Sequence, residues 1–122
     1  DQMVHEVPGR IDHRSPTSSV PEIKYGAWQR VEVTPGGTLA QALDSSAPII
    51  INSLHLQGVD RVGEGVTVEA TASDGLVEAL SIDRATAFCL GVQWHPEALP
   101  ENPVSVALFD AFVAACVDAR DG

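Results

Sequence analysis

Alternation between apolar and polar residues predicts strands through the middle of the chain. Residues 28–33 alternate until Pro35-Gly36-Gly37 interrupts the pattern, and Ile49-Ile50-Ile51 is a β-branched run without a polar face. A strand that is apolar on both sides is expected where helices cover both faces of a sheet. The pattern therefore indicates an α/β fold in which residues 49–51 are buried on both faces.

The most specific local pattern predicts a β-hairpin over residues 66–82. Apolar residues alternate with polar ones, including Glu69, as far as Ser73; Asp74-Gly75 then supplies a favoured turn dipeptide. The first strand is thus expected to bury one face and to turn Glu69 toward solvent.

Glu78 lies among apolar neighbours in the returning strand of this hairpin. Burying a carboxylate without a partner costs several kcal/mol, so Glu78 is expected either to face solvent or to be paired. Arg61 and Arg84 are the partners that the sequence suggests.

Two helices are predicted on either side of these strands. Thr38 is suited to cap a short helix over residues 39–43, and Asn102 followed by Pro103 is a typical helix start. From Val104 to Ala119 apolar residues recur at helical spacing. The second helix is therefore expected to pack its broad apolar side on the sheet.

Residues 1–26 are predicted to be an irregular connecting segment that precedes a domain over residues 27–122. Prolines, a glycine and a Ser/Thr cluster break any periodic pattern in this segment. Its two histidines, His5 and His13, are expected to be solvated, as single histidines in loops usually are.

Candidate chemistry is concentrated at His95 and Glu97. The bulky run from Phe88 to Trp94 predicts a strand, and Pro96 stops it directly after His95. In an extended backbone residues 95 and 97 point to the same side, so the carboxylate can bind one ring nitrogen and leave the other free as a base. The pair supplies two members of a nucleophile, base and orienter triad.

A second candidate site follows the isoleucine run. Ser53, His55 and Gln57 fall on one side of an extended backbone, and ligands in open α/β sheets collect where strands end. These residues are predicted to bind substrate. The alternative is that they cap a loop and satisfy its backbone.

Composition narrows the classes of partner. The 122 residues carry a formal charge of −10, from 17 acidic and 7 basic residues, which argues against nucleic acid or an anionic membrane as a partner. The chain starts at Asp1 without an apolar leader, so neither a secretory signal nor a membrane span is expected. Cys89 and Cys116 have apolar neighbours and no metal-ligand spacing, which predicts buried, reduced thiols and a cytoplasmic location.

Three segments together resemble a known family: Asn52-Ser53-Leu54-His55-Leu56-Gln57-Gly58, Asp74-Gly75-Leu76-Val77-Glu78-Ala79 and Gly91-Val92-Gln93-Trp94-His95-Pro96-Glu97. They are similar, in this order, to segments of class I glutamine amidotransferase domains, and specifically of γ-glutamyl-γ-aminobutyrate hydrolase-like enzymes (peptidase family C26). The resemblance covers about residues 28 to 119. It implies the C-terminal half of a three-layer, flavodoxin-like fold with a mixed sheet, a β-hairpin and a C-terminal helix.

The resemblance also implies a mechanism that this chain completes only in part. In the family a cysteine on a Gly-x-Cys-x-Gly elbow joins the histidine and the glutamate, here His95 and Glu97, to hydrolyse γ-glutamyl amides or glutamine. No such elbow occurs in the sequence. Cys89 is six residues from His95 in one strand, roughly 20 Å away at about 3.3 Å per residue, and neither Cys116 nor Ser53 lies on an elbow.

The chain is therefore expected to be inactive alone and to act only with the half that carries the cysteine. Its expected partners are that N-terminal half and a small γ-glutamyl substrate; a homo-oligomer is also possible, because an incomplete sheet leaves an open edge. No cofactor or metal is required. Two alternatives are a non-catalytic binding or regulatory module, and a metal site formed by His95, Glu97 and His55, although the two-residue spacing is unusual for ligands.

Overall fold

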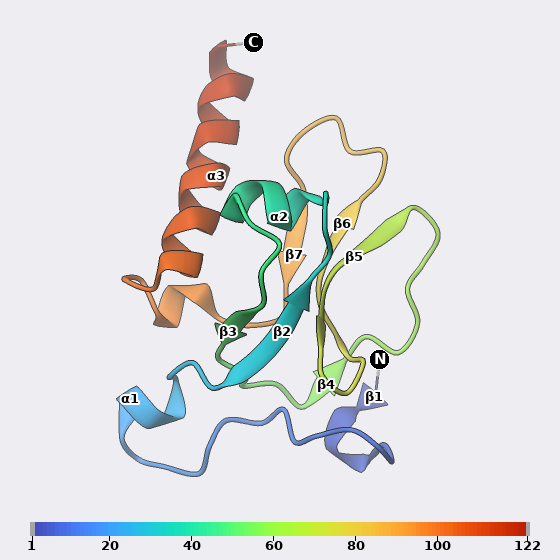
Figure 1. Cartoon of the computed structure of the whole chain (residues 1–122), viewed down its shortest axis with the longest axis vertical. Coiled ribbons are helices and arrows are strands. Elements are labelled where there is room, and N and C mark those ends of the chain that lie inside the picture. The colour runs from blue at the N-terminus through green and yellow to red at the C-terminus, as the bar shows by residue number, and fades with distance from the viewer. Residues whose placement is uncertain (1, 122) are drawn as a thin grey trace.

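The computed structural model describes residues 2–121, which form a five-stranded sheet, a separate two-stranded sheet and flanking helices (Figure 1). The larger sheet has the strand order β3-β2-β5-β6-β7, and each neighbouring pair is antiparallel. In chain order the elements are β1 (Gln2–Met3), η1 (Val4–Glu6), α1 (Pro21–Lys24), β2 (Gln29–Val33), α2 (Thr38–Leu43), β3 (Ile49–Ile51), β4 (Gln57–Gly58), β5 (Val66–Ala72), β6 (Val77–Ile82), β7 (Leu90–Val92), η2 (Pro96–Ala98) and α3 (Pro103–Asp121).

The predicted hairpin is formed by β5 and β6. Gly75 adopts a φ of +85°, which favours glycine, and the Asp74 carboxylate accepts a hydrogen bond from the Leu76 N–H at 3.1 Å. The register shifts between Val68 and Ala70, and Glu69 is buried. The prediction that Glu69 faces solvent is wrong because this irregularity interrupts the simple alternation.

The buried Glu69 carboxylate also explains how α2 begins. The helix starts at Thr38 after Gly37, and no side chain caps it from the N-cap position, contrary to the expected cap by Thr38. Instead Glu69 Oε2 accepts the Leu39 N–H at 3.0 Å, while Oε1 accepts the Ser81 hydroxyl at 2.6 Å. A Cβ on Gly37 would lie 2.2 Å from Glu69 Oε2, so glycine is required for this close approach.

The strands β2 and β3 differ in how well the sequence predicted their burial. In β2 the buried residues alternate with exposed ones, as expected. In β3, Ile51 is in the core, but Ile50 is 46% exposed, so the expectation of two covered faces is wrong. The reason is that Ile50 is paired with Arg30 of β2, which is exposed, so both side chains lie on the solvent-facing side of the sheet.

Helix α3 begins as predicted and packs over only part of its length. Asn102 Oδ1 accepts the Val104 N–H at 3.0 Å, and Ser105 and Leu108 are buried. The C-terminal part of the helix extends past the strands (Figure 1). The prediction that its broad side packs on the sheet is wrong there, because four large apolar residues are exposed: Phe109, Phe112, Val113 and Val117.

The core lies between the larger sheet and α2, with Val31, Leu39, Ile51, Ala70 and Trp94 among its members. The structure has the α/β fold class that the sequence predicted, including the hairpin and the C-terminal helix. The expectation of a mixed sheet is wrong for the described residues, because every pair of neighbouring strands in the larger sheet is antiparallel. Both cysteines are exposed free thiols, so the prediction that they are buried is wrong. Over residues 2–121 there is no helix with the length and apolarity needed to cross a bilayer.

Candidate functional site

The structure brings His95 and Glu97 into contact, as the sequence predicted. His95 follows β7, and its Nδ1 lies 2.6 Å from Glu97 Oε1. The two side chains are 46% and 64% exposed, so the pair lies at the surface. The contact does not come from extended backbone: Glu97 lies in η2, a 3-10 turn that starts at Pro96. The turn carries the carboxylate back toward the ring.

The charge state of Glu97 suits an orienting role. The hydrogen bond from His95 holds the pKa of the Glu97 carboxyl below its usual range, and a backbone N–H lowers it further. The ionised carboxylate accepts a hydrogen bond from Nδ1–H. In this tautomer the lone pair of the ring is on Nε2, as a general base requires.

Asn52 fixes the backbone of His95, a contact that sequence analysis did not predict. Its Oδ1 accepts the His95 N–H at 2.9 Å, and its Nδ2 donates to the carbonyl oxygens of His95 at 3.0 Å and Tyr25 at 3.1 Å. The side chain is fully buried just after β3. It joins two segments that are 43 residues apart, and no local spacing reveals such a pairing.

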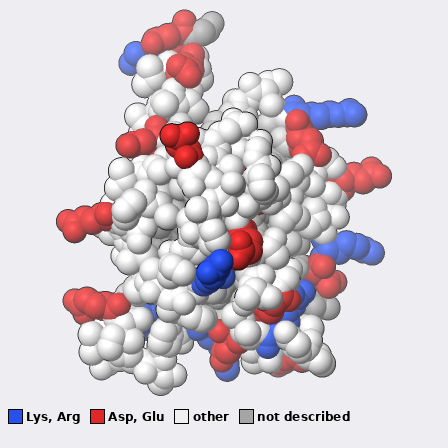
Figure 2. Space-filling model, viewed as in Figure 1, with Lys and Arg blue, Asp and Glu red and all other residues white. Residues whose placement is uncertain are grey.

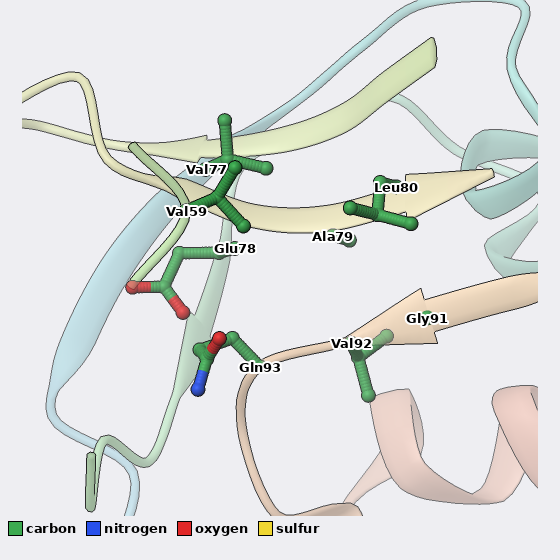
Figure 3. Close-up of a pocket in the computed structure, with 8 residues that line it drawn as sticks. All are labelled: Val59, Val77, Glu78, Ala79, Leu80, Gly91, Val92 and Gln93. Carbon is green, nitrogen blue, oxygen red and sulfur yellow. The ribbon is translucent and has the colours of Figure 1, made fainter. Parts of the chain in front are cut away.

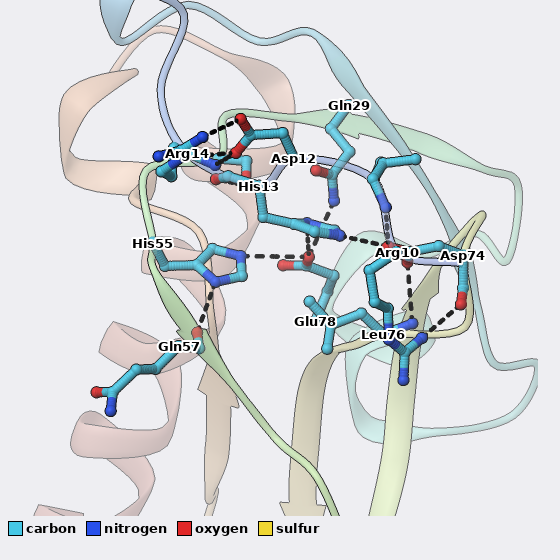
Figure 4. A network of polar contacts seen from close by, with 12 residues as sticks. Arg10, Asp12, His13, Arg14, Gln29, His55, Gln57, Asp74, Leu76 and Glu78 are labelled. Carbon is cyan, nitrogen blue, oxygen red and sulfur yellow. Dashed lines mark hydrogen bonds and ion pairs between the residues drawn. The ribbon is translucent and has the colours of Figure 1, made fainter. Parts of the chain in front are cut away.

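A second polar group, which we call the buried cluster, consists of His13, His55, Asp74 and Glu78 (Figure 4). His13 Nε2 lies 2.7 Å from Asp74 Oδ2, and His13 Nδ1 lies 3.2 Å from Glu78 Oε1. His55 Nε2 lies 3.5 Å from the same Glu78 oxygen. The expectation that His13 is solvated is wrong, because its side chain is fully buried between these two carboxylates.

The partners of Glu78 also differ from those expected. It is buried and lies beside the two histidines, and Gln29 Nε2 donates to its Oε1 at 2.9 Å; the predicted pairing with Arg61 or Arg84 is wrong. Both histidines come from segments outside the hairpin. The partner choice was therefore set by tertiary structure rather than by neighbouring charges in sequence.

Burial and pairing act in opposite directions on the ionisation of the buried cluster. Burial lowers the pKa of His13, but the adjacent Glu78 and Asp74 carboxylates outweigh this effect and raise it. Burial raises the pKa values of Glu78 and Asp74, but the contacts with His13, together with other donors, outweigh it and lower them. Both carboxylates are therefore ionised at neutral pH.

The three residues predicted to bind substrate do not share one surface. Ser53 is buried and its hydroxyl donates to the His13 carbonyl oxygen at 2.6 Å; the His55 N–H donates to the same oxygen at 3.2 Å. The side chain of Gln57 is exposed, while its carbonyl oxygen lies 2.7 Å from His55 Nδ1. Residues 52–57 thus connect the His95 backbone to the buried cluster.

Two neighbouring cavities open beside Glu78 and Gln57. The first, of about 180 Å³, is lined by residues of β6 and β7, and Figure 3 shows the Glu78 and Gln93 side chains pointing toward the same space. The second, of about 400 Å³, is lined by Gln57, Arg61 and Gln93, among others. Gln93 borders both cavities. Of the three residues predicted to bind substrate, Gln57 is therefore the one that lines a cavity open to solvent.

Comparison with known proteins identifies a family for this sequence. Residues 1–97 match the family described as Peptidase C26. The chain belongs to the Peptidase C26 family. It is 40% identical over 112 residues to the γ-glutamyl-γ-aminobutyrate hydrolase PuuD of Escherichia coli, an alignment that covers 91% of this chain and 44% of PuuD. It is 43% identical over 89 residues to a putative glutamine amidotransferase of Mycobacterium tuberculosis, covering 70% of this chain and 28% of that protein.

Family membership confirms the resemblance inferred from the three sequence segments, and with it the amidotransferase-like fold class. The chain spans less than half the length of the curated relatives it matches first. The matched region of this C26 chain includes His95 and Glu97.

Proposed function

We propose that this chain supplies the base and the orienter of a hydrolase that cleaves γ-glutamyl amides. The observation that carries the proposal is the contact of 2.6 Å between His95 Nδ1 and Glu97 Oε1 at the exposed end of β7. The curated relative of similar sequence is a γ-glutamyl-γ-aminobutyrate hydrolase, which supports a substrate of this class. The nucleophile is a cysteine on a separate N-terminal half.

The chemistry assigned to His95 follows from its tautomer. Nε2 accepts the proton of the cysteine thiol, and the thiolate attacks the carbonyl carbon of the γ-amide. The tetrahedral intermediate collapses, the carbon–nitrogen bond breaks, and Nε2 returns the proton to the departing amine. Water then attacks the γ-glutamyl thioester as His95 accepts its proton, which releases the acid and regenerates the thiol. Glu97 holds the ring and stabilises the imidazolium in both steps.

We assign different roles to the residues predicted to contact substrate. Gln57 remains a substrate-binding residue in the proposal, because its side chain is exposed beside a cavity. Ser53 and His55 act indirectly, since their polar groups bind His13 and Gln57 and hold the segment that follows β3. The exposed free thiols of Cys89 and Cys116 suit a reducing compartment such as the cytoplasm.

An apolar groove beside the dyad supports docking of the N-terminal half. The groove, of about 290 Å³, lies between β7 and α3 and is lined by Phe88, Leu90, Val92, Pro96, Leu108, Phe109 and Phe112. Within residues 2–121, β7 pairs with β6 alone and is an edge strand. Because Pro96 lines the groove, a polypeptide that covers it reaches the immediate neighbourhood of His95.

The proposal is tested by the release of p-nitroaniline from γ-glutamyl p-nitroanilide. We expect the 122-residue chain alone to release none. We expect turnover when it is produced together with a half that carries the Gly-x-Cys-x-Gly elbow, either one encoded with it or that of the E. coli relative. A folded, assembled protein that shows no turnover would instead identify the chain as part of a non-catalytic binding module.

A further inference from the structure

We propose that His13, His55 and Glu78 of the buried cluster form a binding site for one divalent transition-metal ion, with Zn²⁺ as the ion best suited to it. The three residues come from the segment before β2, the segment after β3, and β6. Each offers one ligand atom, and these atoms lie within 4.8 Å of one another. The inference is independent of the proposed hydrolase activity.

The first argument concerns the direction of the two imidazole rings. His13 Nε2 is 2.7 Å from an Asp74 carboxylate oxygen, and His55 Nδ1 is 2.7 Å from the Gln57 carbonyl oxygen. Both oxygens can only accept, so each of these ring nitrogens donates its N–H. In a neutral imidazole the other nitrogen then carries a lone pair. Figure 4 shows that the other nitrogen of each ring faces Glu78, so in the neutral form, which is the form that binds a metal ion, both rings turn a lone pair toward this carboxylate.

The second argument is that the inward-facing atoms lack hydrogen-bond partners. His13 Nδ1 and His55 Nε2 approach Glu78 Oε1 at 3.2 and 3.5 Å. Neither approach has hydrogen-bond geometry, and both nitrogens, like Glu78 Oε2, are buried without a hydrogen-bond partner among the described residues. A tetrahedral ion about 2.0–2.1 Å from each ligand holds its ligands roughly 3.3–3.5 Å apart. The observed nitrogen to oxygen distances match this separation.

The third argument is charge. The Asp74 and Glu78 side chains are almost completely buried, and among the described residues their carboxylates form no ion pair with lysine or arginine, only contacts with His13 and His55. Gln29 donates one neutral hydrogen bond to Glu78, and Arg10 binds the backbone carbonyl of Asp74. A divalent cation between the rings and Glu78 compensates both carboxylates.

The donor set selects the ion. Two imidazole nitrogens and one carboxylate oxygen suit Zn²⁺, whereas Mg²⁺ and Ca²⁺ prefer oxygen ligands. The Asp74 contact with the outer nitrogen of His13 is the carboxylate to histidine arrangement that orients metal-bound imidazoles. The site differs from the metal site first considered from sequence, because His55 is joined by His13 and Glu78 rather than by His95 and Glu97.

A metal ion at this position fastens the N-terminal segment to the sheet. His13 lies in a segment with little regular structure, and its carbonyl oxygen receives hydrogen bonds from Ser53 and His55. Ser53 and His55 belong to the segment after β3, which also contains Asn52, the residue that holds the His95 backbone. Bound Zn²⁺ thus stabilises the segment after β3 that holds His95 in place, and it does not contact His95 or Glu97.

The test uses the full 122-residue chain, refolded after EDTA treatment with or without Zn²⁺ so that the buried site can fill. We expect one Zn²⁺ per chain by elemental analysis and a melting temperature several degrees higher in the zinc-loaded protein. Long-range ¹H–¹⁵N spectra of the unmutated protein should show zinc-dependent shifts at His13 Nδ1 and His55 Nε2. This readout does not depend on whether a variant folds.

Matched substitutions separate the proposed site from surface binding. His55→Gln and Glu78→Gln should abolish or weaken stoichiometric zinc binding, whereas His95→Gln and Glu97→Gln should leave it unchanged. The proposal is overturned if the refolded chain retains no Zn²⁺, if zinc shifts the His95 nitrogens and leaves His13 and His55 unaffected, or if the His95 and Glu97 variants lose the metal instead.

Discussion

The side chain of Asn52 binds backbone groups of His95 and Tyr25. We therefore regard it as a positioning residue rather than a catalytic one. Replacing Asn52 by Ala leaves the His95 N–H and carbonyl and the Tyr25 carbonyl without that partner. We expect a loss of about 1–3 kcal/mol in the free energy of unfolding, because the groups lie in a part-buried site. Urea denaturation of the 122-residue chain measures it.

The control for Asn52→Ala is Asn102→Ala, which removes the cap at the start of α3 and leaves His95 untouched. Both variants should lose stability, but only Asn52→Ala should increase the mobility of the His95 amide in ¹⁵N relaxation. Equal mobility of that amide in the two variants would contradict the positioning role.

The ionisation of Glu97 gives a direct measure of its contact with His95. Because the hydrogen bond from His95 is the main cause of the lowered pKa, His95→Ala should move the Glu97 pKa upward, toward 4.5. The contact contributes stability above pH 4.5 and loses it as the pH falls through the depressed folded-state pKa. Carboxyl ¹³C titration measures the shift, and identical titration curves in the two proteins would show that the contact does not form in solution.

At this scale, prediction from sequence succeeded where the partners are close in the chain. Glu97 is two residues from His95, so spacing alone indicated the pair. His13 meets Asp74 across 61 residues, and Asn52 meets His95 across 43. No local pattern encodes such contacts. They follow from the sheet topology, which brings the end of β3, the turn after β5 and the N-terminal segment together.

At the scale of the elements, the start of α2 depends on a side chain from another strand. Glu69→Gln replaces one of the two acceptor oxygens, which serve the Leu39 N–H and the Ser81 hydroxyl, by an NH₂ donor. A buried donor left without its acceptor costs about 1–3 kcal/mol, so we expect a loss of roughly 2 kcal/mol in unfolding free energy. Thr38→Ala should change it by less than about 0.5 kcal/mol, because Thr38 does not cap the helix. If urea denaturation shows a larger loss of stability for Thr38→Ala than for Glu69→Gln, Thr38 is the cap after all.

The positions of the strands and helices were largely predictable from sequence. Their register and the burial of their faces were not. Alternation and turn dipeptides located β2, β5 and β6. Alternation assumes a constant period, however, and the shifted register near Glu69 breaks it. Apolar residues in α3 and β3 indicated burial, but local sequence does not reveal which of these apolar faces the rest of the fold leaves exposed.

On the scale of the whole molecule, charged side chains leave areas of uncharged surface between them. In the face that Figure 2 shows, many acidic and basic side chains project at the margin and a few lie near the centre. The groove between β7 and α3 is lined by apolar side chains, and its Phe112 is 55% exposed. Exposed apolar surface of this kind favours association with another polypeptide. We expect the isolated chain to self-associate through this groove when its partner half is absent.

Phe112→Asp tests that expectation. The substitution places a charge in the groove and should shift the chain toward monomer in light scattering at micromolar concentration. Val20→Asp is the matched control, because Val20 is 45% exposed but does not line the groove, and it should leave the association unchanged. A wild-type chain that is already a stable monomer would argue against an open docking face.

The central claim is that His95 is the base of a hydrolase assembled from two parts, and one rate comparison tests it most directly. In the protein assembled with its cysteine-bearing half, His95→Ala should lower the kcat for γ-glutamyl p-nitroanilide by about a thousandfold or more. His5→Ala, which changes a histidine outside both the dyad and the buried cluster, should leave kcat near the wild-type value. A His95→Ala protein that retains wild-type kcat would contradict the account.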